Sequence, residues 1–161
     1  MKTSIKYLVA IFAMALTFVS CSNDDETAVN ELEGITKFKE ITNDTHTIEL
    51  YSQMGSLEQG YNEISLRIKD NTTDKYIKNA EVSWAPLMHM TSMSHSCPYS
   101  AVEKVTENGT LYSGYIMFQM AQNETEYWDL KIDYNINGVD YTATDVIDVP
   151  ASTKRKVNTF M

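Results

Sequence analysis

The chain has 161 residues, and its 13 basic and 22 acidic residues give a formal net charge of −9 at pH 7. An acidic protein repels nucleic acid and anionic lipid surfaces, so this charge argues against both as binding partners. The length suits one folded domain with short extensions at its ends.

The N-terminus has the pattern of a secretory signal peptide. Lys2 and Lys6 are followed by an apolar run over residues 7–19, which is shorter than the roughly 20 residues of a transmembrane helix. Cys21 and the three residues before it resemble a bacterial lipobox, although Phe18 stands where leucine is usual. We therefore expect lipidation of Cys21 and a lipoprotein of the cell envelope, held on the outer membrane and facing the periplasm or the cell surface. The alternative is an ordinary signal peptide with a chance cysteine.

Changes in composition divide the chain into four parts. A cleaved lipoprotein signal peptide is expected over residues 1–20, and an acidic stretch follows over residues 21–34. That stretch cannot bury enough apolar surface to fold, so we expect a flexible tether. The folded domain is expected over residues 35–150, and residues 151–161 form a polar, basic tail.

Between residues 35 and 150 several short runs alternate apolar and polar residues, which is the pattern of strands with one buried face. In chain order, the expected strands cover residues 47–53, 62–69, 76–84, 112–120, 127–136 and 139–149. Asn137-Gly138, between the last two, is a strong hairpin signal. No helical periodicity is found after the signal peptide. The pattern predicts an all-β fold, an antiparallel β-sandwich.

Residues 88–97, which read MHMTSMSHSC, are the richest segment for metal chemistry. Only serine and threonine separate their three methionines, two histidines and one cysteine. Thioether, imidazole and thiolate groups are soft or borderline donors that suit copper, as Cu(I), and in second place zinc. The segment lacks an apolar period, and Pro86 and Pro98 flank it, so we expect a ligand-bearing loop.

Alternate residues of an extended segment point the same way, so this loop offers two candidate clusters. The first choice of ligands is Met88, Met90, His95 and Cys97, followed by His89 and Met93. Cys97 has no disulfide partner once Cys21 is lipidated, which leaves an intermolecular bridge, a reactive thiol or a metal ligand.

The same residues have plainer interpretations. The methionines could fill the open end of the sandwich, a role that suits their flexible side chains. Cys97 could be a buried, inert thiol. Elsewhere, Met54 and Met117 are expected in the core, and His46, alone on a polar segment, is expected at the surface.

Nothing in the sequence is typical of an enzyme. It has no nucleophile elbow, no H-E-x-x-H motif and no glycine-rich phosphate loop. A Cys97 nucleophile beside His95 is the remaining alternative, and a methionine-crowded loop suits it poorly. We therefore expect no catalytic activity.

Several elements over residues 55–150 resemble, in their order, the YtkA/FixH-like domains. These elements are Gly60-Tyr61-Asn62, Asn79-Ala80-Glu81-Val82, Pro86-Leu87-Met88-His89-Met90, Ser113-Gly114-Tyr115, Phe118-Gln119-Met120 and Trp128-Asp129-Leu130. The resemblance implies an immunoglobulin-like sandwich and adds Met120 as a candidate metal ligand. This chain departs from the family pattern in its second histidine, in Cys97, and in Glu126-Tyr127-Trp128, where a G-x-W element is usual.

Domains of this family occur in exported proteins that handle copper or assist respiratory oxidase assembly. The resemblance thus implies a membrane-anchored copper-binding lipoprotein that acts as a chaperone, buffer or tolerance factor. A copper-delivery or oxidase-assembly protein would be its partner. The alternative is an immunoglobulin-like protein-interaction module of a surface complex, without a metal.

Overall fold

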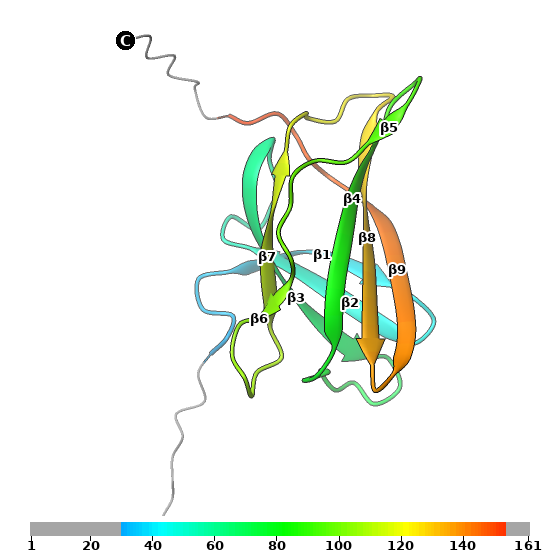
Figure 1. The fold of residues 1–161 in the computed structure, drawn as a ribbon. Helices are drawn as coiled ribbons and strands as arrows, with labels where there is room; N and C mark the ends of the chain where they lie inside the picture. The colour runs from blue at the N-terminus through cyan, green and yellow to red at the C-terminus, as the bar shows by residue number, and fades with distance from the viewer. Residues whose placement is uncertain (1–29, 154–161) are drawn as a thin grey trace, which may run out of the picture.

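The computed structural model describes residues 30–153, which form two antiparallel sheets and no helix (Figure 1). The predicted signal peptide and the lipidation site at Cys21 lie outside the described residues. No helix in the described part is long and apolar enough to span a membrane. The strands are β1 (Thr36–Thr42), β2 (His46–Ser52), β3 (Gly60–Asp70), β4 (Glu81–His89), β5 (Ser94–His95), β6 (Glu103–Lys104), β7 (Tyr112–Phe118), β8 (Tyr127–Ile136) and β9 (Val139–Ile147).

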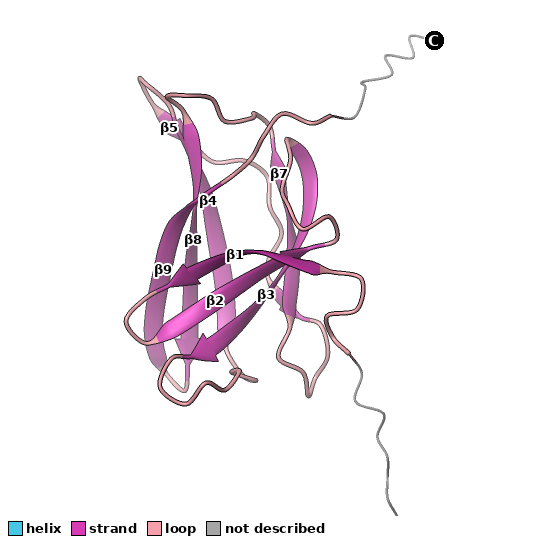
Figure 2. Cartoon of the chain, turned by 180° about the vertical axis from the view of Figure 1, so that it is seen from behind, coloured by secondary structure: helices cyan, strands magenta, loops and turns pink. Residues whose placement is uncertain are grey.

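The strand order of the two sheets is that of an immunoglobulin-like sandwich. One sheet has the order β1-β2-β3-β7-β6 and the other β5-β4-β8-β9. Apart from the added edge strand β1, these orders match the A-B-E-D sheet and the sheet of strands C, F and G extended by a C′ strand. Figures 1 and 2 show from opposite sides that β1, β2 and β3 cross the direction of β4, β8 and β9. The predicted fold class is confirmed.

The core lies between the sheets and follows the predicted alternation. In β8, Trp128, Leu130, Ile132 and Tyr134 are buried, and the residues between them are more exposed. Ile64, Leu66 and Ile68 of β3, which are fully buried, belong to the same core cluster. Burying each large apolar side chain contributes about 1.5–3 kcal/mol, so this cluster supplies the main stabilisation.

The hairpin between β8 and β9 is also as predicted. Asn137 and Gly138 have φ angles of 52° and 85°, the left-handed conformations that a two-residue type I′ turn needs. The ladder then runs from Ile136 opposite Val139 to Trp128 opposite Ile147. The turn thereby fixes which residues of β9 face the core.

Strand β4 differs most from the prediction. The strand expected over residues 76–84 begins at Glu81 and continues to His89, so part of the expected loop is strand. The Pro86 carbonyl accepts a hydrogen bond from Ser96 Oγ at 2.7 Å, so its N and C=O face away from β8. Proline is tolerated there because no ladder hydrogen bond is lost. The short strands β5 and β6 and the edge strand β1 were not predicted.

Three side chains are placed differently from the sequence interpretation. Met54 and Met117 are 70% and 41% exposed, because Met54 lies in the β2–β3 turn and Met117 faces outward from β7. His46 is only 5% exposed. Its ring lies edge-on against Tyr134 and Tyr141, and its Nδ1 is 2.8 Å from Thr45 Oγ1.

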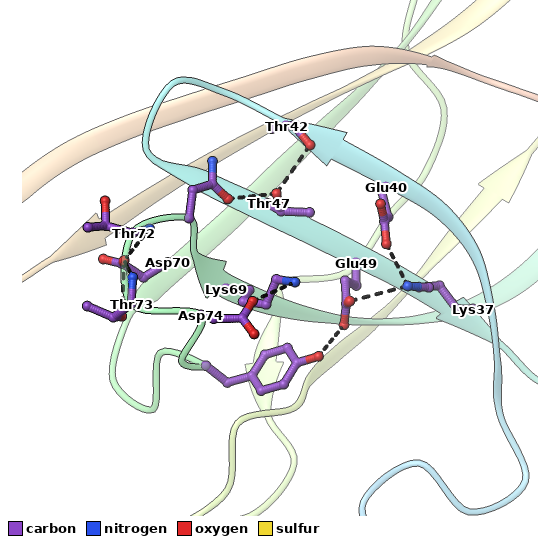
Figure 3. Close-up of polar contacts among 12 residues, drawn as sticks. Lys37, Glu40, Thr42, Thr47, Glu49, Lys69, Asp70, Thr72, Thr73 and Asp74 are labelled. Carbon is purple, nitrogen blue, oxygen red and sulfur yellow. Dashed lines mark hydrogen bonds and ion pairs between the residues drawn. The ribbon is translucent and has the colours of Figure 1, made fainter.

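On the outer face of the first sheet, polar side chains of β1, β2 and the segment after β3 interact with one another (Figure 3). Glu49 is 4% exposed and accepts hydrogen bonds from Tyr51 Oη at 2.6 Å, Tyr76 Oη at 2.9 Å and Lys37 Nζ at 3.3 Å. Burial raises the pKa of Glu49, but these donors outweigh it and hold the pKa below its ordinary value. The carboxylate therefore stays charged and joins β1, β2 and the segment after β3.

The end of the predicted tether is part of the folded structure. Glu31 accepts hydrogen bonds from Thr106 Oγ1 at 2.9 Å and from the Thr110 backbone N–H at 2.9 Å. A side chain at Gly109 would overlap the Glu31 carboxylate, so any larger residue there would displace Glu31 from these hydrogen bonds. The ordered domain thus includes residues 30–34, which were assigned to the tether.

His46 should make stability depend on pH in a window above the carboxylate range. Burial lowers the pKa of His46, and nearby Asp70 only partly opposes this. The unfolded chain therefore binds more protons, and stability falls as the pH drops below the ordinary histidine pKa of about 6.5. We expect His46→Gln to flatten this dependence of the unfolding free energy between about pH 7.5 and 5.5, where one proton changes it by at most about 1.4 kcal/mol per pH unit. Urea unfolding at several pH values measures the unfolding free energy. An unchanged slope of this free energy against pH in the variant would contradict the role of His46.

Candidate functional site

Candidate metal-binding side chains gather at the end of the sandwich where β4 meets β5. Met88 lies opposite His95 of β5 and opposite Trp128 of β8. Directly paired residues point to the same side of a sheet, so all three side chains face inward. Met88 is fully buried and His95 is partly buried.

Trp128 contacts several of the residues at this end of the sandwich. Its ring is fully buried and lies edge-on to His95 at 5.8 Å and to Phe118 at 5.1 Å between centroids. Its Nε1 donates to the Met120 carbonyl at 2.9 Å, which holds the β7–β8 connection against the same end. Figure 1 shows this connection beside the β4–β5 hairpin.

Met90 and Met120 are partly buried and pack against the core. Three thioethers and one imidazole thus come from β4, the β4–β5 turn, β5 and the β7–β8 connection. Met90, His95 and Met120 are partly exposed to solvent, and Met88 is fully buried beneath them.

Cys97 follows directly after this group and belongs to the core cluster with Met88. It is 7% exposed, and burial raises the pKa of its thiol to about 11. The thiol is therefore protonated at neutral pH, and a metal that binds it must displace the proton.

His89 is separated from these donors. It lies on the outer face of its sheet, where its Nε2 is 2.5 Å from Asp129 Oδ2 and its ring stacks on Tyr127 at 4.8 Å. Histidine ligands of metals often have such a carboxylate partner on the second ring nitrogen. This pair cannot reach the inward group, because the sheet lies between them.

Met93 is also separated. It is 62% exposed at the tip of the β4–β5 hairpin, and its carbonyl accepts a hydrogen bond from the Met90 backbone N–H at 2.9 Å. Its backbone closes the turn, and its side chain extends into solvent.

The structure therefore separates the predicted metal ligands into two sets. Met88, Met90, His95, Cys97 and Met120 lie at the inner side of the β4–β5 end, and His89 and Met93 lie apart from them. Residues 30–153 contain no group of three or more His, Cys, Asp and Glu side chains that could hold a metal ion. A site of three or more side chains in the described part would therefore need a donor of another kind, such as methionine sulfur. The sequence analysis did not predict that Trp128 contacts His95 and the Met120 carbonyl, nor that His89 pairs with Asp129. Both follow from the β4–β8 register, which the sequence alone does not give.

Comparison of the chain with models of protein families, with curated proteins and with solved structures finds no match. Membership of the YtkA/FixH-like family therefore stays a prediction that rests on the motifs in the sequence.

Proposed function

We propose that the β4–β5 end of the sandwich binds Cu(I), with Met88, Met90, Met120 and His95 as ligands. The observation that carries this proposal is the register that puts Met88 and His95 on the inner face with Trp128. Met90 and Met120 pack against the same core, and the Met120 carbonyl accepts a hydrogen bond from the Trp128 indole. Four neutral donors satisfy the low coordination number and soft character of Cu(I).

The donor set favours Cu(I) over Zn(II). Zinc prefers thiolate, imidazole and carboxylate ligands, and thioethers contribute little to its binding. No acidic side chain belongs to the inward group, so a divalent ion would stay uncompensated in a partly desolvated place. A monovalent soft ion costs less to desolvate.

Cys97 is a fifth candidate ligand, and its binding would release a proton. As a thiolate it would supply the charge that the other four donors lack, at the cost of displacing the proton of a buried thiol. His89 and Met93 would stand outside the primary site, and Met93 is placed to meet an ion before it enters.

A binding protein, not an enzyme, fits this arrangement. Its donors are mainly thioethers, which bind soft ions and do not transfer protons. Together with the lipobox-like sequence at Cys21, this supports a membrane-anchored copper chaperone, buffer or tolerance factor. Its partner would be a copper-delivery or oxidase-assembly protein.

The second candidate function is that of an immunoglobulin-like interaction module without metal. One observation favours it, since Met88 is fully buried and could serve as core filler alone. The experiments below separate the two functions.

Replacing Met88 and Met90 together by leucine should weaken Cu(I) binding by about tenfold or more, which is about 1.4 kcal/mol. Leucine keeps the volume and apolar character, so the unfolding free energy should change by less than about 1.5 kcal/mol. Titration against a competing Cu(I) chelator measures the affinity, and Trp128 beside His95 provides a fluorescence signal that bound copper should quench.

The matched control is Met54→Leu with Met117→Leu, which removes two exposed thioethers outside the site. This control should bind Cu(I) as the unchanged protein does. Intact copper binding in the Met88/Met90 variant, together with a large loss of stability, would show that these methionines are core filler. That result would contradict the proposed ligand set and favour the interaction module.

The pH dependence of Cu(I) affinity should reveal whether Cys97 is a ligand. If binding displaces its proton, affinity rises about tenfold per pH unit below the thiol pKa. We expect this rise between about pH 8 and 9, above the ordinary imidazole pKa of about 6.5, and its loss in Cys97→Ser. A flat profile in the unchanged protein would remove Cys97 from the ligand set and leave the four neutral donors.

Lipidation at Cys21 is tested independently. Cells fed a labelled fatty acid should incorporate label into the protein, and Cys21→Ala should abolish it. Label retained in the variant would contradict the membrane anchor without affecting the copper proposal.

A further inference from the structure

A groove of about 500 Å³ lies on the outer face of the first sheet, and none of its lining residues belongs to the proposed copper site. Its walls include Glu33, Glu58 and Glu63, and none of its lining side chains is basic. Two exposed apolar side chains also line it, since Met54 is 70% and Tyr61 58% exposed. The groove thus combines negative charge with accessible apolar surface.

The chain that follows β9 is directed to this groove. The Gln59 backbone N–H donates to the Pro150 carbonyl at 2.8 Å, and Ser152 Oγ donates to Glu58 Oε2 at 3.1 Å. Glu58 is itself a wall of the groove. The described residues therefore end, at Thr153, next to a residue that is hydrogen-bonded to an acidic wall of the groove.

We propose that this groove binds the basic segment formed by residues 154–161 of the same chain. The segment begins Lys154-Arg155-Lys156 and ends Phe160-Met161, and it contains no acidic residue. Its three positive charges complement the three carboxylates of the groove, and its apolar end complements Met54 and Tyr61.

The length of the segment is sufficient. An extended chain advances about 3.3 Å per residue, so the three basic residues fall within about 13 Å of Ser152. Because Ser152 is already held at Glu58, the groove meets the segment at the high effective concentration of an intramolecular ligand. Arg155 or a lysine can also lie over the exposed Tyr61 ring.

The groove is thereby a receptor for a short Lys/Arg-rich segment with an apolar end. A basic segment of another protein would have to displace residues 154–161 to bind there.

The test uses a fluorescently labelled synthetic peptide of residues 151–161 and two forms of the protein, the full chain and a chain that ends at Thr153. Fluorescence anisotropy should show binding to the shortened chain and binding at least about threefold weaker to the full chain, whose own segment competes. Full-chain Lys154→Ala/Arg155→Ala/Lys156→Ala, which keeps the length, should bind the peptide as the shortened chain does.

The groove is identified by a pair of matched variants of the shortened chain. Glu33→Gln/Glu63→Gln should weaken peptide binding about fivefold, whereas Glu103→Gln/Glu124→Gln, which removes the same charge from exposed positions elsewhere, should not. Equal loss in both pairs would mean unspecific charge attraction and would overturn the proposal. Equal binding to the full and shortened chains would overturn the intramolecular occupant. Neither result depends on copper.

Discussion

The pairing of Met88 with Trp128 in the β4–β8 ladder decides what each residue of the Met/His segment can do. Side chains alternate between the two faces of a strand, so this register puts Met88 inside and His89 outside. A shift by one residue would place His89 against the core and Met88 in solvent. The sheet thus separates the soft donors of residues 88–97. Met88 and His95 face the core, and His89 faces outward beside Asp129.

The end of the sandwich where the inward group lies is closed by contacts between connections rather than by strands. The Trp128 indole holds the β7–β8 connection through the Met120 carbonyl. That connection in turn binds the chain after β9, since the Gln122 backbone N–H donates to the Val149 carbonyl at 2.9 Å. Such an end is less rigid than the strand ladders below it, because loops deform more easily than ladders.

Alternation was enough to predict the strands with one buried face, as β8 illustrates, and Asn137-Gly138 was enough to predict its hairpin. Prediction from local pattern failed where contacts between distant parts of the chain decide the structure. Pro86 argued against a strand, but its N and C=O face the side of β4 without a ladder partner. His46 stood among polar neighbours, yet Tyr134 and Tyr141, almost a hundred residues away, bury its ring. For the same reason, the sequence could indicate the donors of the candidate site but not their separation by the sheet.

Pro86 also has a consequence for how copies of this protein behave at high concentration. Strand β4 pairs with β5 only at Met88 and His89, which leaves most of one side of β4 without a partner strand. An open strand side of this kind can recruit the same strand of another molecule and start aggregation. Pro86 offers no N–H there, and the Ser96 hydroxyl occupies its carbonyl, so the sheet cannot be extended through the middle of β4. The residue that made the strand hard to predict thus also opposes pairing of β4 with a strand of another molecule.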